Sequence, residues 1–149
     1  MPKAHRTARK APATAPPYSE SSGLIAEPSG PESGARSLIL PWPPSMNRMW
    51  RSVGGRAILS RAGRDYRADG LMCLSGQRGP SFPAGPVAVA ITVHPPDRRR
   101  RDLDNMAKAV LDLLTHGAVY GDDSQIDYLL IRRAERTPGG YVKVEVQPL

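Results

Sequence analysis

HPPDRRRRDLDNMAKAVLDLLTHGAVYGDDSQID, residues 94–127, concentrates the charge of this 149-residue chain. Four consecutive arginines, Arg98 to Arg101, run into two aspartates, Asp102 and Asp104, and a second acidic pair, Asp122 and Asp123, follows. Clustered carboxylates repel one another unless a cation neutralises them, and a divalent cation does this well. A phosphodiester backbone would engage both the arginines and the bound cation. The pattern therefore favours a magnesium-dependent nuclease.

The spacing of the acids predicts how they would meet a metal ion. Asp102 and Asp104 are two residues apart where an extended segment is expected to become a helix. In extended backbone such residues share a face, so both carboxylates can converge on one ion. Magnesium prefers oxygen ligands in near-octahedral geometry, and two-metal nucleases hold their ions roughly 4 Å apart. Asp123 is expected to approach from the loop after the helix, with one of Asp122 and Asp123 binding metal and the other supporting it.

Each of these acids also has a plainer interpretation. Asp104 could serve as the N-cap of the helix, worth about 1 kcal/mol. Asp122 and Asp123 could be turn residues. Capping explains neither Asp102 nor the arginines beside it, so the metal site is favoured for the group as a whole.

Lys108 follows Asp104 by one helical turn and lies on the same face. It could face the metal site and stabilise charge on the phosphate. It could equally form a surface pair with Asp104 or Asp112, worth a few tenths of a kcal/mol. The spacing leaves both interpretations open.

The basic residues indicate an anionic partner. The formal net charge is +7, with a pI near 10.1, which suits nucleic acid. The block Arg98–Arg101 could be a solvated loop, but its place directly before the acids favours phosphate binding. Asn47, Arg48 and Arg51, in and after a proline-rich turn, are further candidate DNA-binding residues. The sequence contains neither a GxxxxGK[ST] phosphate loop nor an HExxH zinc motif.

Composition predicts one domain preceded by a leader. Many of the 16 prolines and 14 glycines fall in the first 35 residues, so we expect residues 1–35 to be a disordered basic leader and residues 36–149 to form the domain. No run approaches the ~18 apolar residues of a membrane span, which predicts a cytoplasmic protein without a membrane partner. Cys73 is the single cysteine, which excludes an intramolecular disulfide; its apolar neighbours predict a buried thiol.

Hydrophobic periodicity predicts an α/β (α+β) domain with a mixed sheet and two main helices. The expected elements, in order, are a strand at 37–41, a hairpin at 50–60 turning at Gly54-Gly55, a helix at 60–75 capped by Ser60, a strand at 87–93, a helix from 104 to about 116, and strands at 128–136 and 140–147. The 87–93 strand, VAVAITV, is almost continuously apolar and is expected to be buried on both faces. The last two strands are expected to pair as a hairpin.

Three motifs together resemble the RusA-type Holliday junction resolvases. They are LPWPPSMNRMWR at 40–51, PDRRRRDLDNMAKAVLDLL at 96–114 and DDSQID at 122–127, within a resemblance that covers residue 37 to about 147. The resemblance implies a homodimeric, Mg²⁺-dependent endonuclease, with Mn²⁺ a possible substitute, that nicks two symmetry-related strands of a four-way DNA junction in recombination and repair. It places acidic metal ligands at Asp102, Asp104 and Asp123, and an essential lysine at Lys108.

Two other functions remain open at this point. One is a general metal-dependent nuclease acting on flaps or linear duplex, which would share the acidic residues and differ only in substrate. The other is a non-catalytic junction-binding module, which would leave the carboxylates without a use, because they repel DNA in the absence of metal.

Overall fold

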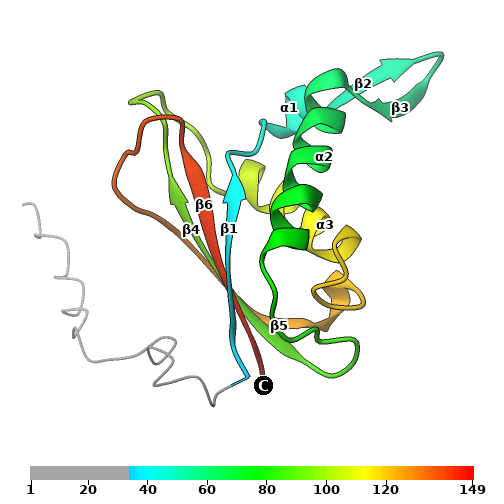
Figure 1. The fold of residues 1–149 in the computed structure, drawn as a ribbon. Helices are drawn as coiled ribbons and strands as arrows, with labels where there is room; N and C mark the ends of the chain where they lie inside the picture. The colour runs from blue at the N-terminus through cyan, green and yellow to red at the C-terminus, as the bar shows by residue number, and fades with distance from the viewer. Residues whose placement is uncertain (1–33) are drawn as a thin grey trace, which may run out of the picture.

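The structure, a computed structural model, describes residues 34–149, and the expected leader lies outside these residues except for its last two. The elements are β1 (Arg36–Pro41), α1 (Met46–Met49), β2 (Trp50–Val53), β3 (Arg56–Leu59), α2 (Arg61–Gly76), β4 (Val87–His94), α3 (Asp104–His116), the 3-10 turn η1 (Asp123–Gln125), β5 (Ile126–Arg133) and β6 (Tyr141–Pro148). The fold is α+β with a mixed sheet, as predicted, and has one helix, the short α1, beyond the two main helices expected (Figure 1).

The main sheet has the strand order β1-β6-β4-β5, with β4 parallel to β5 and antiparallel to β6. The predicted hairpin between the last two strands is therefore wrong, because β4 lies between them. Parallel strands need a long crossover, and α3 supplies it between β4 and β5. The turn in which Gly140 donates to the Thr137 carbonyl at 2.8 Å then carries the chain past the end of β4. Alternation in the sequence identified both strands but not their partners.

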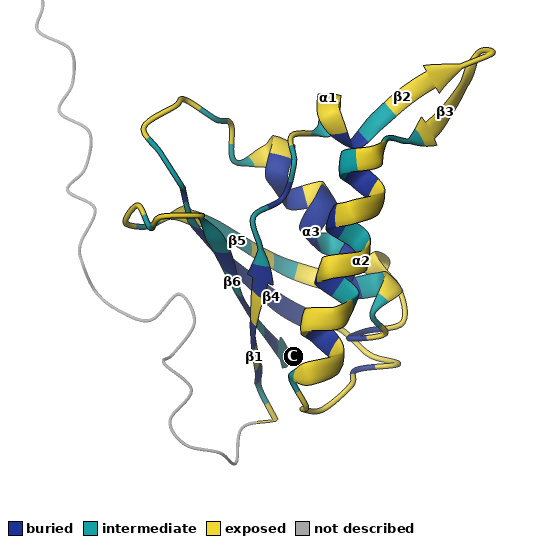
Figure 2. Cartoon of the chain, turned by 45° about the horizontal axis from the view of Figure 1, so that its top comes forward, coloured by how far each residue is buried: buried dark blue, intermediate teal, exposed yellow. Residues whose placement is uncertain are grey.

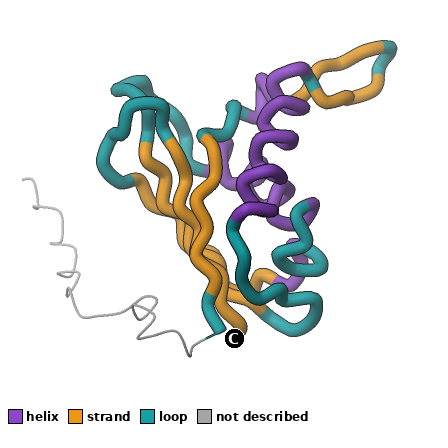
Figure 3. The backbone as a smooth tube through the Cα atoms, viewed as in Figure 1, coloured by secondary structure: helices purple, strands orange, loops and turns teal. Residues whose placement is uncertain are grey.

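Helices α2 and α3 cover one face of this sheet (Figures 1 and 3). Every residue of β4 from Val87 to Val93 is buried, as predicted for a central strand. On β6 the residues alternate, and those that face the helices are 0% exposed: Val142, Val144 and Val146. Figure 2 shows the buried residues gathered between the sheet and the helices. The core is mainly aliphatic, in keeping with the low aromatic content.

Helix α2 begins as predicted, because the Ser60 side chain accepts a hydrogen bond from the Gly63 backbone N–H at 3.0 Å. Its buried residues follow a four-residue spacing, with Tyr66, Gly70 and Leu74 facing the core. Cys73 is exposed, so the expectation of a buried thiol is wrong. The apolar run around it is helical, and only one side of a helix faces the core.

The short strands β2 and β3 form a separate two-stranded sheet that projects away from the main body (Figure 1). Gly54 and Gly55 both have positive φ, 57° and 75°, as the predicted tight turn requires. Within residues 34–149, no helix has the length and apolar character needed to cross a membrane.

Gly63 tests the packing of α2 against the preceding segment. A Cβ at this position would lie 2.5 Å from the Met49 backbone oxygen, so Gly63→Ala should lower the melting temperature, although alanine favours helix by up to about 1 kcal/mol. Gly76→Ala is the matched control, because nothing lies within 4 Å of its Cβ position. It should leave the melting temperature unchanged or raise it. Equal effects of the two substitutions in thermal denaturation would contradict this account.

Candidate active site

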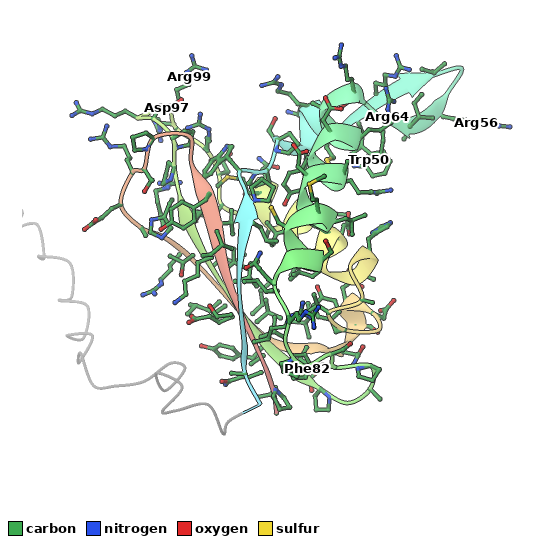
Figure 4. All side chains as sticks on the ribbon, in the orientation of Figure 1. Trp50, Arg56, Arg64, Phe82, Asp97 and Arg99 are labelled. Carbon is green, nitrogen blue, oxygen red and sulfur yellow. The ribbon has the colours of Figure 1, made fainter. Side chains whose placement is uncertain are left out.

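The loop between β4 and α3 is held by an ion pair between Asp97 and Arg101. The Arg101 guanidinium donates to both carboxylate oxygens, at 2.6 Å and 3.0 Å, and the Arg99 backbone N–H donates to the same carboxylate at 2.9 Å. These hydrogen bonds, from the Arg101 side chain first, lower the pKa of Asp97 to about 2. Figure 4 shows Asp97 and Arg99 together at the edge of the sheet where β4 ends.

Arg101 also joins the loop to its surroundings. Its guanidinium lies 5.5 Å from the centroid of the Trp42 ring, a cation–π contact with the proline-rich turn after β1. Its backbone carbonyl accepts a hydrogen bond from the guanidinium of Arg133, the last residue of β5. The loop is thereby connected to two separate parts of the fold, the turn after β1 and the end of β5.

Asp102 and Asp104 share a hollow of about 470 Å³ at the N-terminus of α3. The hollow is also lined by Leu103 and by three basic residues: Arg100, Arg101 and Arg133. Leu103 occupies the N-cap position, and α3 has no side-chain cap hydrogen bond. The interpretation of Asp104 as a simple N-cap is therefore wrong. The free N–H groups of the first turn and the helix dipole add positive potential to the hollow that the two exposed aspartates line.

Asp122 and Asp123 are arranged differently from each other. The Asp122 carboxylate accepts a hydrogen bond from the Ser124 N–H at 2.8 Å and caps η1, and hydrogen bonding with Ser124 lowers the pKa of Asp122. Asp123 is an exposed residue of the first turn. The turn interpretation thus describes Asp122, and Asp123 is the acid better placed to take an external ligand.

The two acidic groups do not meet within one chain. Asp104 is the first residue of α3 and Asp123 follows the helix, whose 13 residues rise by about 18 Å from first to last. The Tyr120 hydroxyl, whose pKa is raised by burial and then by nearby acids including Asp123, donates to the Leu111 carbonyl at 3.0 Å. The segment that leads to Asp123 therefore lies beside the second half of the helix at Tyr120. Among residues 34–149, no group of three or more His, Cys, Asp or Glu side chains could hold a metal ion.

Lys108 pairs with Asp112 at 3.5 Å on the exposed surface of α3. This is one of the two surface pairs considered from the sequence, and with a Lys108 side chain that is 61% exposed it contributes little to stability. The ammonium is free to exchange this partner for a phosphate.

Of the candidate DNA-binding residues, Arg48, Arg99, Arg100 and Arg101 line one hollow, a second and larger one that also contains Asp102. Arg98, Arg99 and Arg100 are exposed on the loop. Arg101 donates two hydrogen bonds to Asp97, whereas the Arg99 guanidinium makes only a long ion pair with it at 3.9 Å. Asn47 on α1 and Arg51 on β2 are exposed nearby in the chain.

Two residues of the site were missed by sequence reasoning. The Gln125 side-chain oxygen accepts from the Gly121 and Asp122 N–H groups at 2.8 Å and 2.9 Å, and its amide nitrogen donates to the Phe82 and Gly85 carbonyls. A signal existed, because an Asp followed three residues later by Gln is a capping-box pattern. Arg133 had no such signal, since only the parallel pairing of β4 with β5 places it beside Asp102 and Asp104.

Comparison with known proteins gives one consistent result. Residues 41–147 match the family described as Endodeoxyribonuclease RusA. The chain is 40% identical over 110 residues to the crossover junction endodeoxyribonuclease of Enterobacteria phage 82, covering 73% of this chain and 91% of that protein. The corresponding Escherichia coli K12 protein is 40% identical over 111 residues (74% and 92%). That of Enterobacteria phage HK97 is 34% identical over 112 residues (75% and 93%).

The Asp97–Arg101 pair predicts a measurable pH dependence. Since the pKa of Asp97 is lowered to about 2 in the folded chain, against about 3.9 in an unfolded one, its stabilising effect is present above pH 4. It is lost as the pH falls from about 4 to about 2. NMR titration should place the Asp97 midpoint near 2, and Arg101→Lys should raise it. Arg99→Lys, at a side chain 84% exposed, should change it less. Equal shifts would assign the lowered pKa to a different cause.

Proposed function

The chain belongs to the Endodeoxyribonuclease RusA family, and on that basis we propose that it is a divalent-metal-dependent endonuclease that resolves four-way DNA junctions by paired nicks in recombination and repair. The observation that carries this proposal is the hollow in which Asp102 and Asp104 stand among three arginines at the N-terminus of α3. Carboxylates beside phosphate-binding cations suit a phosphodiester substrate. A general nuclease on flaps or duplex would use the same residues, and no feature of the hollow favours it.

The acid pair fits Mg²⁺. This ion is commonly bound by one or two carboxylates, several waters and substrate phosphate oxygens. Within residues 34–149 neither Asp102 nor Asp104 forms an ion pair with an arginine, because Arg101 is directed to Asp97 and Arg133 to a backbone carbonyl. Both carboxylates therefore stay available as ligands. When bound there, Mg²⁺ or Mn²⁺ supplies charge neutralisation and polarises the phosphate to be cut.

The remaining residues bind and position the DNA. Arg98, Arg99 and Arg100 are exposed and can reach phosphates on either side of the cut. The N–H groups at the start of α3 add donors that favour the phosphate nearest the acids. Lys108 stands one turn further along this helix, where its ammonium would stabilise the charge that develops during cleavage.

Two independent considerations support a second copy of the chain. Paired nicks in two strands need two sites related by a two-fold axis. A single chain also does not bring Asp123 to Asp102 and Asp104, since these acids are separated along α3. In a symmetric dimer, Asp123 of the partner subunit would complete each cluster. We therefore include a homodimer with two shared sites in the proposal.

Mixing two inactive variants tests the shared site. Asp104→Asn chains and Asp123→Asn chains should each fail to cut a four-way junction with Mg²⁺. Heterodimers of the two should regain one intact site, formed by Asp104 of one chain and Asp123 of the other. They should therefore nick one strand, which denaturing electrophoresis of a labelled junction detects.

The controls separate this outcome from simpler ones. Mixed Asp104→Asn and Asp102→Asn chains should stay inactive, because both substitutions fall on the same side of the shared site. The site is not shared as proposed if the Asp104→Asn and Asp102→Asn mixture nicks the junction. The same conclusion follows if the Asp104→Asn and Asp123→Asn mixture does not nick it. Wild-type protein that cuts linear duplex as fast as the junction would support the general nuclease.

The arginine loop predicts a change in salt dependence. Replacing Arg99 and Arg100 by Gln should weaken binding to any DNA, and each lost phosphate contact should reduce the log–log salt slope by about 0.9. Arg61→Gln is the matched control, because this arginine is 90% exposed, lies on α2 and pairs only loosely with Asp65 at 3.8 Å. An unchanged slope for Arg99 and Arg100, measured by fluorescence anisotropy, would mean that the loop is merely solvated.

A further inference from the structure

A hollow of about 650 Å³ adjoins the acid pair and is not accounted for by metal binding. It lies between the proline-rich turn after β1, helix α2 and the loop after β4. Its polar and aromatic lining includes Trp42, Arg48, Tyr66, Asp69, Asp102 and Asn105. The volume is in the range of sites that bind small organic molecules. Because Asp102 lines both hollows, a group bound here would lie directly beside the phosphate to be cut.

Tyr66 supplies an independent sign of a missing ligand. It is 5% exposed, and its hydroxyl is closed to solvent and has no hydrogen-bond partner among residues 34–149. A buried hydroxyl without a partner is destabilising, and most buried polar groups in native proteins are satisfied. The same fold satisfies another buried tyrosine, Tyr120, through the Leu111 carbonyl. Among residues 34–149 the buried side-chain nitrogen and oxygen atoms without a partner are the Tyr66 hydroxyl and the Arg36 Nε, and of these two residues only Tyr66 lines this hollow.

The lining determines what kind of group fits. Trp42 and the prolines beside it offer a flat apolar wall, and Tyr66, Asp69 and Asn105 offer donors and acceptors at different places around it. Arg48, Arg99 and Arg100 line the same hollow and can bind phosphates. A flat aromatic group with hydrogen-bonding edges, attached to phosphates on both sides, matches this arrangement. A nucleotide has these properties.

We infer that this hollow receives one unpaired nucleobase of the junction strand that is cut, with the Tyr66 hydroxyl bonded to its edge. The inference rests on the proposed function and adds to it a binding site that recognises a nucleobase. Extruding a base costs least where pairing is already broken, as at the branch point of a junction. Flexible side chains that line the hollow, such as Arg48 and Met106, can change rotamer to admit it. The seated base would then select which phosphate reaches Asp102.

A double-mutant cycle between protein and DNA tests this contact. Binding is measured in the Asp104→Asn background, which prevents cutting and leaves the larger hollow unaltered. Each nucleotide flanking the branch point is replaced in turn by an abasic one, with and without Tyr66→Phe. At one strand position the missing base should weaken binding roughly threefold to tenfold. Tyr66→Phe should weaken binding to the intact junction. It should cause no further loss of affinity for the junction that lacks the base at that position.

The free protein provides a second readout that does not depend on DNA. Tyr66→Phe removes an unpaired buried hydroxyl and should raise or preserve the melting temperature. Tyr120→Phe removes a paired hydroxyl, so it should lower the melting temperature. The loss of affinity caused by each abasic substitution should stay as it is in the Asp104→Asn background protein. A lower melting temperature for Tyr66→Phe would show that the hydroxyl has a partner within the protein, and would overturn the inference.

The DNA experiment separates the failure of the inference from the failure of the proposed function. One outcome is that the background protein binds the junction more tightly than duplex while Tyr66→Phe and each abasic substitution weaken binding independently at every strand position. In that case the hollow does not hold a base, and the proposed function stands. If the background protein shows no preference for the junction over duplex, the proposed function fails and the base-reading site fails with it.

Discussion

The burial of β4 is the constraint on which the rest of the structure depends. This strand is hydrogen-bonded on both edges and covered on one face by α2 and α3, and all its residues from Val87 to Val93 are buried. Full burial of an aliphatic side chain is worth about 1.5–3 kcal/mol, so this strand has little freedom to move. The loop that leaves its carboxyl end therefore starts from a rigid point. Because β5 is parallel to β4, its own carboxyl end meets the same loop, and Arg133 comes to lie beside the acids.

The four arginines of the block, Arg98 to Arg101, have two different roles, although they are identical in the sequence. Arg101 is held by Asp97, by the Trp42 ring and through its carbonyl by Arg133, so it shapes the loop. Its three predecessors are exposed; Arg99 makes only a long contact of 3.9 Å with Asp97, so all three can turn to an anionic partner. Arg101 is bonded to Asp97 and Arg133 to a backbone carbonyl, and neither Asp102 nor Asp104 forms an ion pair among residues 34–149. Unpaired carboxylates close together are unfavourable without a cation, and this physical condition makes the acid pair a candidate metal site.

The loop that carries Asp122 and Asp123 is held by the hydrogen bonds of a different residue, Gln125. Gln125 satisfies two N–H groups of the loop and two carbonyls of the connector before β4, so one amide fastens the Asp122–Asp123 turn to the sheet end. A Cβ on Gly121 would approach the Pro83 carbonyl to 2.8 Å, so this position needs glycine for close packing. The loop is thus firmly placed, yet at the far part of α3 from Asp104. The proposal of a shared site in a second copy rests on this separation of the two acidic groups within one chain.

The sequence by itself determined the local features. Periodicity located β4, α2 and α3, Ser60 marked the start of α2, and Gly54-Gly55 marked the hairpin turn, because each of these signals depends on neighbouring residues alone. The three motifs at 40–51, 96–114 and 122–127 were together also sufficient to identify the family. Tertiary structure alone decided that β4 separates β5 from β6, that Arg133 joins the acid pair, that Cys73 faces outward, and that Tyr66 is buried without a partner beside a hollow. Strand pairing and hydrogen-bond partnership depend on residues far apart in the chain, and no local pattern of apolar and polar residues records which of them will meet.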